Sequence, residues 1–219
     1  MAPWEETIRK HLEETLSQEP PDPAHDLAHF QRVVATSKQI AEKENADLRV
    51  VIPAAWLHDL VNVPKNDPRR SQASRLSAEE ACRYLEKIGY GAQWGNGEKA
   101  RILKEIAHAI EAHSYSAGIE TRSLEARVVQ DADRLDGLGA IGIARVFAVA
   151  GLLKRPLYHS QDPFAKSRTL NDYESTVDHF FVKLFKTVDT LKTPAGKEEG
   201  QRRSAIMRRY LDDLSREIS

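Results

Sequence analysis

The sequence predicts an all-α protein, a helical bundle of about nine helices. Almost every stretch longer than ten residues repeats its apolar side chains every three to four positions, which is the period of a helix with one buried face. No stretch shows the sustained alternation of apolar and polar residues that is typical of a half-buried strand. Proline and glycine break the helical period at 63–74, 89–97 and 154–163, which we expect to be loops.

The helical period, followed along the chain, separates the predicted helices. Their expected ranges are 3–17, 25–45, 50–61, 78–88, 98–113, 121–137, 139–153, 172–190 and 198–217. Ser77 and Glu80 match a capping box at the start of the fourth helix, and Gly89 suits the left-handed position after its end. Asn171 or Asp172 suits the N-cap of the eighth helix.

Length, charge and cysteine content narrow the class of protein. At 219 residues the chain has the size of one domain, and we expect residues 1–219 to form a single domain. With 32 Lys and Arg against 33 Asp and Glu, the net charge of -1 gives no general attraction to duplex nucleic acid or to an anionic membrane. The single cysteine, Cys82, excludes an internal disulfide and a thiolate zinc cluster.

The sequence contains no segment that is expected to enter a membrane. Its first residues are charged throughout and lack the apolar stretch of a signal peptide. The most apolar run, 139–153, is interrupted by Arg145 and is shorter than the roughly 20 residues that span a bilayer. We therefore expect a cytoplasmic protein.

Two predicted helices place histidine and aspartate on or beside an apolar face. In 25–45, His29 shares its face with Val33, Thr36 and Ile40, so this imidazole is expected to point inward. In 50–61, Asp59 falls on the apolar face and His58 lies beside it at the edge, so we expect at least the carboxylate to enter apolar surroundings. A buried carboxylate is costly unless it is protonated, paired or bound to a metal.

Two later helices add further polar groups. In 98–113, His113 continues the apolar stripe, whereas His108 projects about 140° away from it, so only His113 is aimed at the core. The stretch "QDADRLD" in 121–137 offers Asp131, Asp133 and Asp136. Asp136 falls within the apolar stripe and the other two flank it, so periodicity does not choose among the three.

Histidines and carboxylates that enter one core from separate helices are the ligands that a divalent cation requires. The alternatives are ordinary structural roles. A lone inward histidine is more often a hydrogen-bonded core residue than a ligand. Asp131 or Asp136 can equally form a buried ion pair with Arg127 or Arg134.

The order of His29, then His58 and Asp59, then an aspartate in "ADRLD" resembles the H…HD…D signature of the HD-domain metal-dependent phosphohydrolases. The segments "HDLAHFQRV", "HDLVNVPKN", "IEAHS" and "QDADRLDGLGAIGIAR" are similar to the YedJ-like bacterial branch of that superfamily. The resemblance covers about 25–151 and implies an all-helical HD domain, with the helices at 172–217 packed on it. It also implies that Asp133 is the fourth metal ligand.

One position departs from the family pattern. Branches with nucleotidase or alarmone hydrolase activity carry an acidic residue three after the HD aspartate, and this chain has Asn62 there. Asparagine cannot act as a general base, so proton removal falls to another group or to metal-bound water. The candidates for this catalytic role are Asp136 and His113, with His25 as a weaker third.

The resemblance implies a cleaved phosphate ester or anhydride and a bound metal. Manganese is favoured among Mn, Mg, Fe, Co and Ni because histidine ligands make magnesium a poor match, and a second ion is an alternative. The loop after the HD helix offers Lys65, Arg69, Ser71 and Ser74 as phosphate partners, although a solvated loop explains them equally well.

The sequence leaves several substrates, oligomeric states and reaction classes open. Trp94, Tyr115, Tyr158 and Phe164 lie in or beside loops, where they can stack on a nucleobase or pack on the surface, so a nucleotide is one of several candidate substrates. An oligomer is compatible with the sequence. The alternative functions are a di-iron oxygenase of the HD type and a non-catalytic, metal-containing module that binds a nucleotide.

Overall fold

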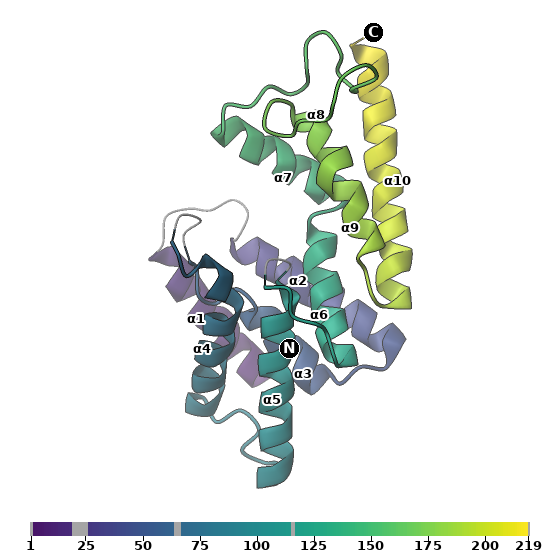
Figure 1. Ribbon diagram of the computed structural model, residues 1–219. Helices are drawn as coiled ribbons and strands as arrows, with labels where there is room; N and C mark the ends of the chain where they lie inside the picture. The colour runs from purple at the N-terminus through teal and green to yellow at the C-terminus, as the bar shows by residue number, and fades with distance from the viewer. Residues whose placement is uncertain (1, 19–25, 64–66, 115–116, 219) are drawn as a thin grey trace. The chain divides into compact units, whose positions relative to one another are not determined.

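The computed structural model describes residues 2–18, 26–63, 67–114 and 117–218, and these residues form helices and loops without a strand. The expected all-α class is confirmed. In chain order the elements are α1 Pro3–Ser17, α2 Leu27–Glu44, α3 Leu48–Leu57, the 3₁₀ turn η1 Arg70–Gln72, α4 Ala73–Lys87, α5 Asn96–His113, α6 Leu124–Asp136, α7 Gly139–Leu152, α8 Thr176–His179, the π-helical turn η2 Phe180–Leu184, α9 Phe185–Asp189 and α10 Pro194–Glu217 (Figure 1).

These elements agree with the expected helices apart from their ends. When the continuous run from Thr176 to Asp189 is counted as one helix, the described residues form nine helices. The structure divides into two compact units, Met1–Asp133 and Arg134–Ser219. A single domain over 1–219 stays a prediction, and each unit is described by itself below.

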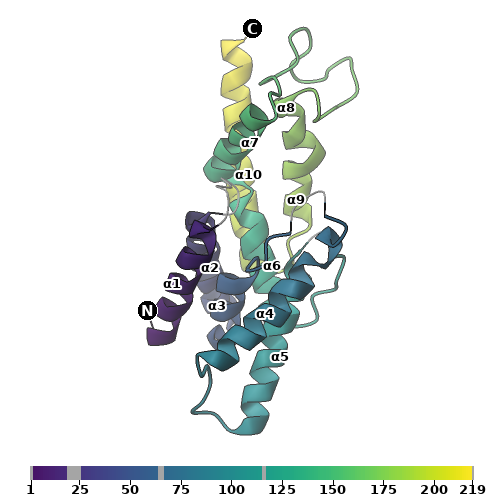
Figure 2. The same cartoon turned by 90° about the vertical axis from the view of Figure 1, so that its left-hand side faces the viewer.

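The first unit is a bundle in which α3 contacts α2 on one side and α5 on another, while α4 lies along α5 (Figure 2). Its N-terminal helix is attached by a buried carboxylate. One oxygen of Glu5 accepts from Nζ of Lys38 at 2.6 Å and from the indole N–H of Trp56 at 3.1 Å. Because these two donors lie on α2 and α3, Glu5 joins the first three helices.

Helix α3 contains a proline, and the structure compensates for it. Pro53 lacks an N–H, so the carbonyl of Arg49 four residues earlier loses its helical donor. The hydroxyl of Tyr90 donates to that carbonyl at 2.7 Å. The ring of Tyr90 packs edge-on against Trp4 and Trp94. The backbone group that the proline leaves unpaired is therefore satisfied from the loop before α5.

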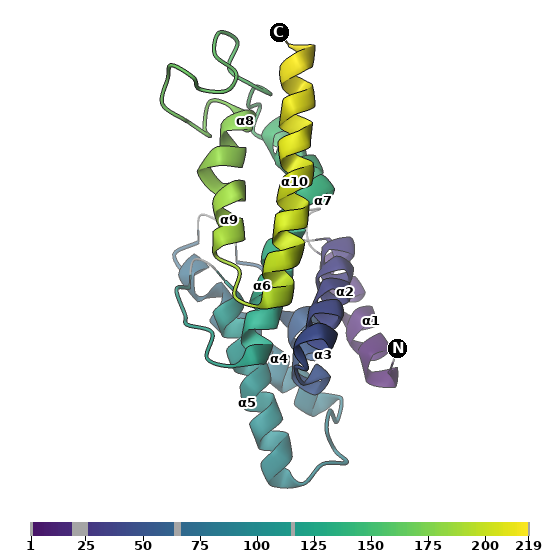
Figure 3. The same ribbon diagram turned by 90° about the vertical axis from the view of Figure 1, so that its right-hand side faces the viewer.

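The second unit is built from α7, the α8–α9 run and α10, with α9 and α10 side by side (Figure 3). Close backbone packing fixes the turn before α7. A Cβ on Gly142 would lie 2.3 Å from the carbonyl oxygen of Gly137, so only glycine fits there. Arg203 of α10 donates to the carbonyl of Leu135 at 2.6 Å, which holds the two ends of this unit together.

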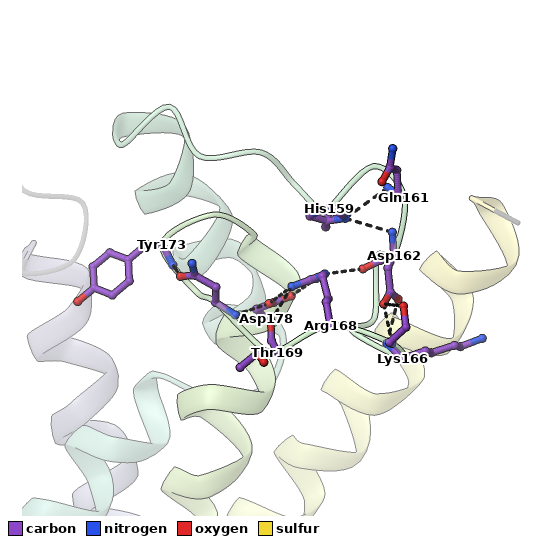
Figure 4. Close-up of polar contacts among 10 residues, drawn as sticks. His159, Gln161, Asp162, Lys166, Arg168, Thr169, Tyr173 and Asp178 are labelled. Atoms are coloured by element: carbon purple, nitrogen blue, oxygen red, sulfur yellow. Dashed lines mark hydrogen bonds and ion pairs between the residues drawn. The ribbon is translucent and has the colours of Figure 1, made fainter.

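A long loop between α7 and α8 is ordered by one ion pair (Figure 4). Both terminal nitrogens of Arg168 donate to the buried carboxylate of Asp178, at 2.6 and 2.7 Å, and the Asn171 N–H adds a third bond. The carboxylate of Asp162 accepts from the backbone N–H groups of Lys166 and Ser167. The loop is thus held by charge-assisted bonds rather than by secondary structure.

Of the three expected helix-end signals, one is confirmed and two are wrong. Gly89 has the left-handed φ of 70° after α4. Helix α4 begins earlier than expected, so Ser77 lies inside it, and its hydroxyl accepts from the Val61 N–H at 3.1 Å instead of capping. The N-cap of α8 is Ser175, and Asn171 instead closes a turn by accepting from the Tyr173 N–H.

Among the described residues, no single helix is long and apolar enough to cross a membrane. Only the consecutive helices α6 and α7, joined across a bend, reach that length and hydropathy together.

Candidate metal centre

His29 enters the core of the first unit from the first turn of α2. Asp26 is the N-cap of this helix, and its carboxylate accepts from the His29 N–H at 2.8 Å. This cap fixes the backbone at the point where the imidazole leaves the helix. The side chain is about 1% exposed, as its inward position in the sequence predicted.

His58 and Asp59 follow the last turn of α3. His58 is the C-cap, and its Nδ1 lies 2.9 Å from the carbonyl oxygen of Ala55. The expectation that Asp59 enters the apolar interior is wrong: His58 is fully buried and the Asp59 side chain is about 30% exposed. The helix ends at Leu57, so a helical projection no longer describes the two residues after it.

The side chains of these residues converge with Asp133 of α6 on His58. Its Nε2 lies 3.2 Å from Nε2 of His29, 3.8 Å from Oδ2 of Asp59 and 3.8 Å from Oδ1 of Asp133. The same Asp133 oxygen lies 3.7 Å from His29 Nε2. The four predicted ligands therefore meet in one place, with two buried imidazoles beneath two partly exposed carboxylates.

The protonation of His58 suits a metal ligand. Burial lowers the pKa of His58 to about 4, although the nearby charge of Asp59 opposes this shift. The ring is therefore neutral at pH 7. Because Nδ1 donates its hydrogen to the Ala55 carbonyl, the lone pair is on Nε2, which faces the other ligands.

Most of the separations between these atoms are longer than hydrogen bonds. The contacts of Asp133 with the two histidines, at 3.7 and 3.8 Å, are too long for hydrogen bonds. Ligand atoms that each lie about 2.1 Å from one cation are about 3.0 to 3.4 Å apart for angles of 90° to 109°. Only the 3.2 Å between Nε2 of His29 and Nε2 of His58 falls in this range, so the carboxylates of Asp59 and Asp133 would have to move closer to share one ion. The donor set of two imidazoles and two carboxylates suits a divalent cation, and His29, His58 and Asp59 have ligand atoms within 4.8 Å of one another.

His113, at the end of α5, is a fifth member of the cluster. Its Nε2 lies 3.3 Å from Oδ1 of Asp59, and its Nδ1 donates to the carbonyl of Ile110 at 2.6 Å. Burial alone lowers the pKa of His113, but the charge and hydrogen bond of Asp59, together with Asp133, outweigh it and raise the pKa to about 9. The prediction that His113 points into the core is confirmed.

The remaining catalytic candidates have other surroundings. Asp136 belongs to the second unit, where its buried carboxylate forms a 2.5 Å ion pair with Arg145. This is the structural role that the sequence left open, with a different arginine as partner. Asn62 is exposed. His25 lies outside the described residues.

The predicted phosphate partners differ in their accessibility. Arg69 is exposed, and its guanidinium binds both oxygens of Asp67, at 3.1 and 2.8 Å. Ser71 is exposed, whereas Ser74 is buried inside α4. Lys65, like Tyr115 among the aromatic candidates, lies outside the described residues.

Sequence reasoning missed two side chains that support this centre. His108, which the helical projection placed away from the core, accepts from the Arg122 N–H at 3.0 Å and so holds the loop before α6. Gln130 was not singled out, yet its side-chain amide donates to the carbonyl of Ala112, next to His113. A buried amide among charged neighbours in "QDADRLD" was the available signal.

Comparison with known proteins places this arrangement in a family. A family model described as HD domain matches residues 26–138. The chain is 33% identical to the protein YpgQ of Bacillus subtilis (strain 168) over 213 residues, which cover 97% of this chain and 93% of YpgQ.

Solved structures of similar proteins also match this chain over nearly its whole length. The structure of Bacillus subtilis YpgQ in complex with ADP has a TM-score of 0.73 at 33% identity and covers 97% of this chain and 94% of that one. An HD-superfamily hydrolase from Bacillus thuringiensis has a TM-score of 0.72 at 27% identity, over 97% of this chain and 95% of that one. The chain belongs to the HD domain family.

Proposed function

We propose that this protein is a metal-dependent phosphohydrolase that cleaves a phosphate ester or anhydride, with a nucleotide as the favoured substrate class. The convergence of His29, Asp59 and Asp133 on His58, with atoms 3.2 to 3.8 Å from its Nε2, carries the proposal. The likeness to an HD-superfamily hydrolase supports hydrolysis, and the complex of YpgQ with ADP supports a nucleotide.

The four converging side chains are assigned as the ligands. A divalent cation held there would lower the pKa of a bound water to about 7 and neutralise charge on a phosphate. Manganese is favoured over magnesium, because two of the four ligands are imidazoles. The Ala55 carbonyl orients the ring of His58 through its Nδ1, which keeps Nε2 directed at the ligand cluster.

His113 is assigned as the group that moves a proton. Its ring is fixed by the Ile110 carbonyl and faces Asp59 at 3.3 Å, so its Nε2 is the polar atom next to the ligand cluster. Asp136 stays a second candidate, although both its burial and its bond to Arg145 favour a structural role. Asn62 can orient a water or a substrate but cannot remove a proton.

The substrate phosphate is assigned to the loop that follows the HD pair. Arg69 and Ser71 are exposed there, and a phosphate can replace Asp67 on the guanidinium because the pair lies at the surface. Lys65 is close to them in sequence. Ser74 is a weaker candidate because α4 buries it.

The test combines metal analysis with a substrate panel. Protein purified without chelator is analysed for metals and then assayed for phosphate release from nucleotides, dinucleotides, pyrophosphate and sugar phosphates with added Mn²⁺. We expect one or two manganese ions per chain and release from at least one nucleotide. Two irons and visible absorption would favour an oxygenase, and tight nucleotide binding without any release would favour a non-catalytic module.

A further inference from the structure

A side chain from α6 holds the last turn of α5, which carries His113. A helix leaves the carbonyl groups of its last turn without donors from within the helix. In α5 two of these carbonyls are taken by side chains. The His113 ring donates to Ile110, and Nε2 of Gln130 donates to Ala112 at 2.6 Å. Gln130 is about 4% exposed, so water competes little for its bond.

This bond acts on the peptide group that carries His113. The Ala112 carbonyl and the His113 N–H belong to one planar unit, so a donor on that carbonyl fixes the orientation of both. The His113 ring reaches Asp59 from this unit, at 3.3 Å. A rotation of the peptide would therefore move the ring relative to Asp59.

Gln130 also lies one helical turn before Asp133. Residues three apart on a helix are neighbours on its surface, so the bond to Ala112 ties the part of α6 that carries Asp133 to the end of α5. Asp133 in turn lies 3.7 Å from His29. The amide of Gln130 is thus linked to the cluster through His113 on α5 and through Asp133 on α6.

The two polar atoms of the Gln130 amide are unequally satisfied. Within the part of the chain that the structure describes, Oε1 of Gln130 is buried and has no hydrogen-bond partner. A buried acceptor without a donor is destabilising, and an apolar side chain of the same length would remove it. The donor function of Nε2 is then the reason to keep the amide.

We propose that Gln130 is a positioning residue for the metal centre: its amide fixes the end of α5 against α6 and so holds His113 at Asp59 and Asp133 at the histidines. This inference rests on the proposed function, because the spacing matters for activity only if these side chains share an ion.

The first test uses the full-length chain and Mn²⁺ alone. Gln130→Met keeps the side-chain length and removes the donor, and Gln130→Glu keeps the shape and places a carboxylate against the Ala112 carbonyl. By calorimetric titration we expect Mn²⁺ affinity to fall about 10- to 100-fold for Gln130→Met and further for Gln130→Glu. Ile102→Val is the control: Ile102 lies in the core in the first half of α5, about three turns before His113, and the change should leave affinity unchanged.

The second test needs no metal. Imidazole nitrogen shifts of His113 are measured by NMR in chelator-treated protein, where the wild type should show a single ring environment with Nδ1 protonated and bonded to the Ile110 carbonyl. Gln130→Met should broaden or shift these signals. Unchanged His113 signals, or Mn²⁺ affinities that fall equally in Gln130→Met and Ile102→Val, would overturn the positioning role. If the wild type binds no divalent ion, the proposed function fails, while the NMR result still decides the role of Gln130.

Discussion

Two carboxylates, one in each unit, have opposite surroundings. In the second unit, Asp178 is fully buried, and Arg168 and the Asn171 N–H satisfy its oxygens at 2.6 to 2.7 Å (Figure 4). In the first unit, Asp133 is about 28% exposed, and its oxygen lies 3.7 to 3.8 Å from two imidazoles. The oxygens of Asp178 are therefore satisfied by short hydrogen bonds within the protein. The oxygen of Asp133 faces two imidazoles at distances longer than hydrogen bonds.

The difference shows how to separate a structural from a functional carboxylate. Short, charge-assisted bonds from a guanidinium indicate that the protein itself neutralises the group. Several ligand atoms at distances beyond hydrogen bonding, from rings whose other nitrogen is already bonded, indicate a place for a cation. Removing the first kind should affect folding, and removing the second kind should affect metal binding.

The largest effect is expected for Asp59→Ala. It removes one ligand and the partner of His113, so Mn²⁺ affinity should fall more than about 100-fold and activity should fall with it. The chain should still fold, because the lost carboxylate is about 30% exposed. Metal content after dialysis and circular dichroism measure the two outcomes. Full metal content in this variant would contradict the ligand assignment.

The matching change in the second unit is Asp178→Asn. It removes the charge that Arg168 binds, and hydrogen bonds to charged groups contribute about 1.5 to 3 kcal/mol each, so the free energy of unfolding should fall by about that much. Urea denaturation gives this value. Metal content should stay at the wild-type level. A loss of bound metal would contradict the assignment of a purely structural role to Asp178.

Acid should weaken the second unit through the same group. Burial raises the pKa of Asp178, but the bonds from Arg168 and Asn171 outweigh it and hold the pKa below its usual value of 3.8. A lowered pKa stabilises the fold above the unfolded value and loses this stabilisation as pH falls through the folded one. The pKa of Asp162, lowered to about 2 by the N–H groups of Ser167 and Lys166, acts in the same direction.

The measurement is urea denaturation of chelator-treated protein between about pH 4 and pH 2. Wild-type stability should decrease across this range, and Asp178→Asn should show a shallower decrease because it has no group to protonate at this site. Parallel slopes for the two proteins would show that Asp178 does not contribute to the acid dependence.

The smallest structural effect is expected for Arg69→Ala. Its pair with Asp67 lies at the surface, where solvent screens the charges, so the melting temperature should not change measurably. If Arg69 binds the substrate phosphate, KM should rise several-fold while kcat changes less. Equal KM values for the variant and the wild type would remove Arg69 from the substrate site.

Helical periodicity predicted the fold class and the inward histidines because long amphipathic helices leave a strong repeating signal. It failed where the helix ends, since His58 and Asp59 follow the last residue of α3 and their burial is the reverse of the projection. Periodicity also could not choose the metal ligand among the three aspartates of α6. The family resemblance selected Asp133, which lies 3.7 Å from His29 and 3.8 Å from His58, and its role as a ligand stays a prediction.

Other features depend on contacts between distant residues. Nothing near Glu5 in the sequence indicates that Lys38 and Trp56 donate to it, 33 and 51 residues later. The bond from Gln130 to Ala112 likewise joins residues 18 apart. Such bonds follow from the packing of helices, which a single sequence does not specify.

The effect of removing the Tyr90 hydroxyl should depend on whether Pro53 is present. Pro53→Ala would restore the helical donor to the Arg49 carbonyl, after which Tyr90→Phe would lose little, whereas Tyr90→Phe alone would leave that carbonyl without a donor. Tolerance at position 90 is therefore set by the residue at position 53. Among relatives, we expect the two positions to change together.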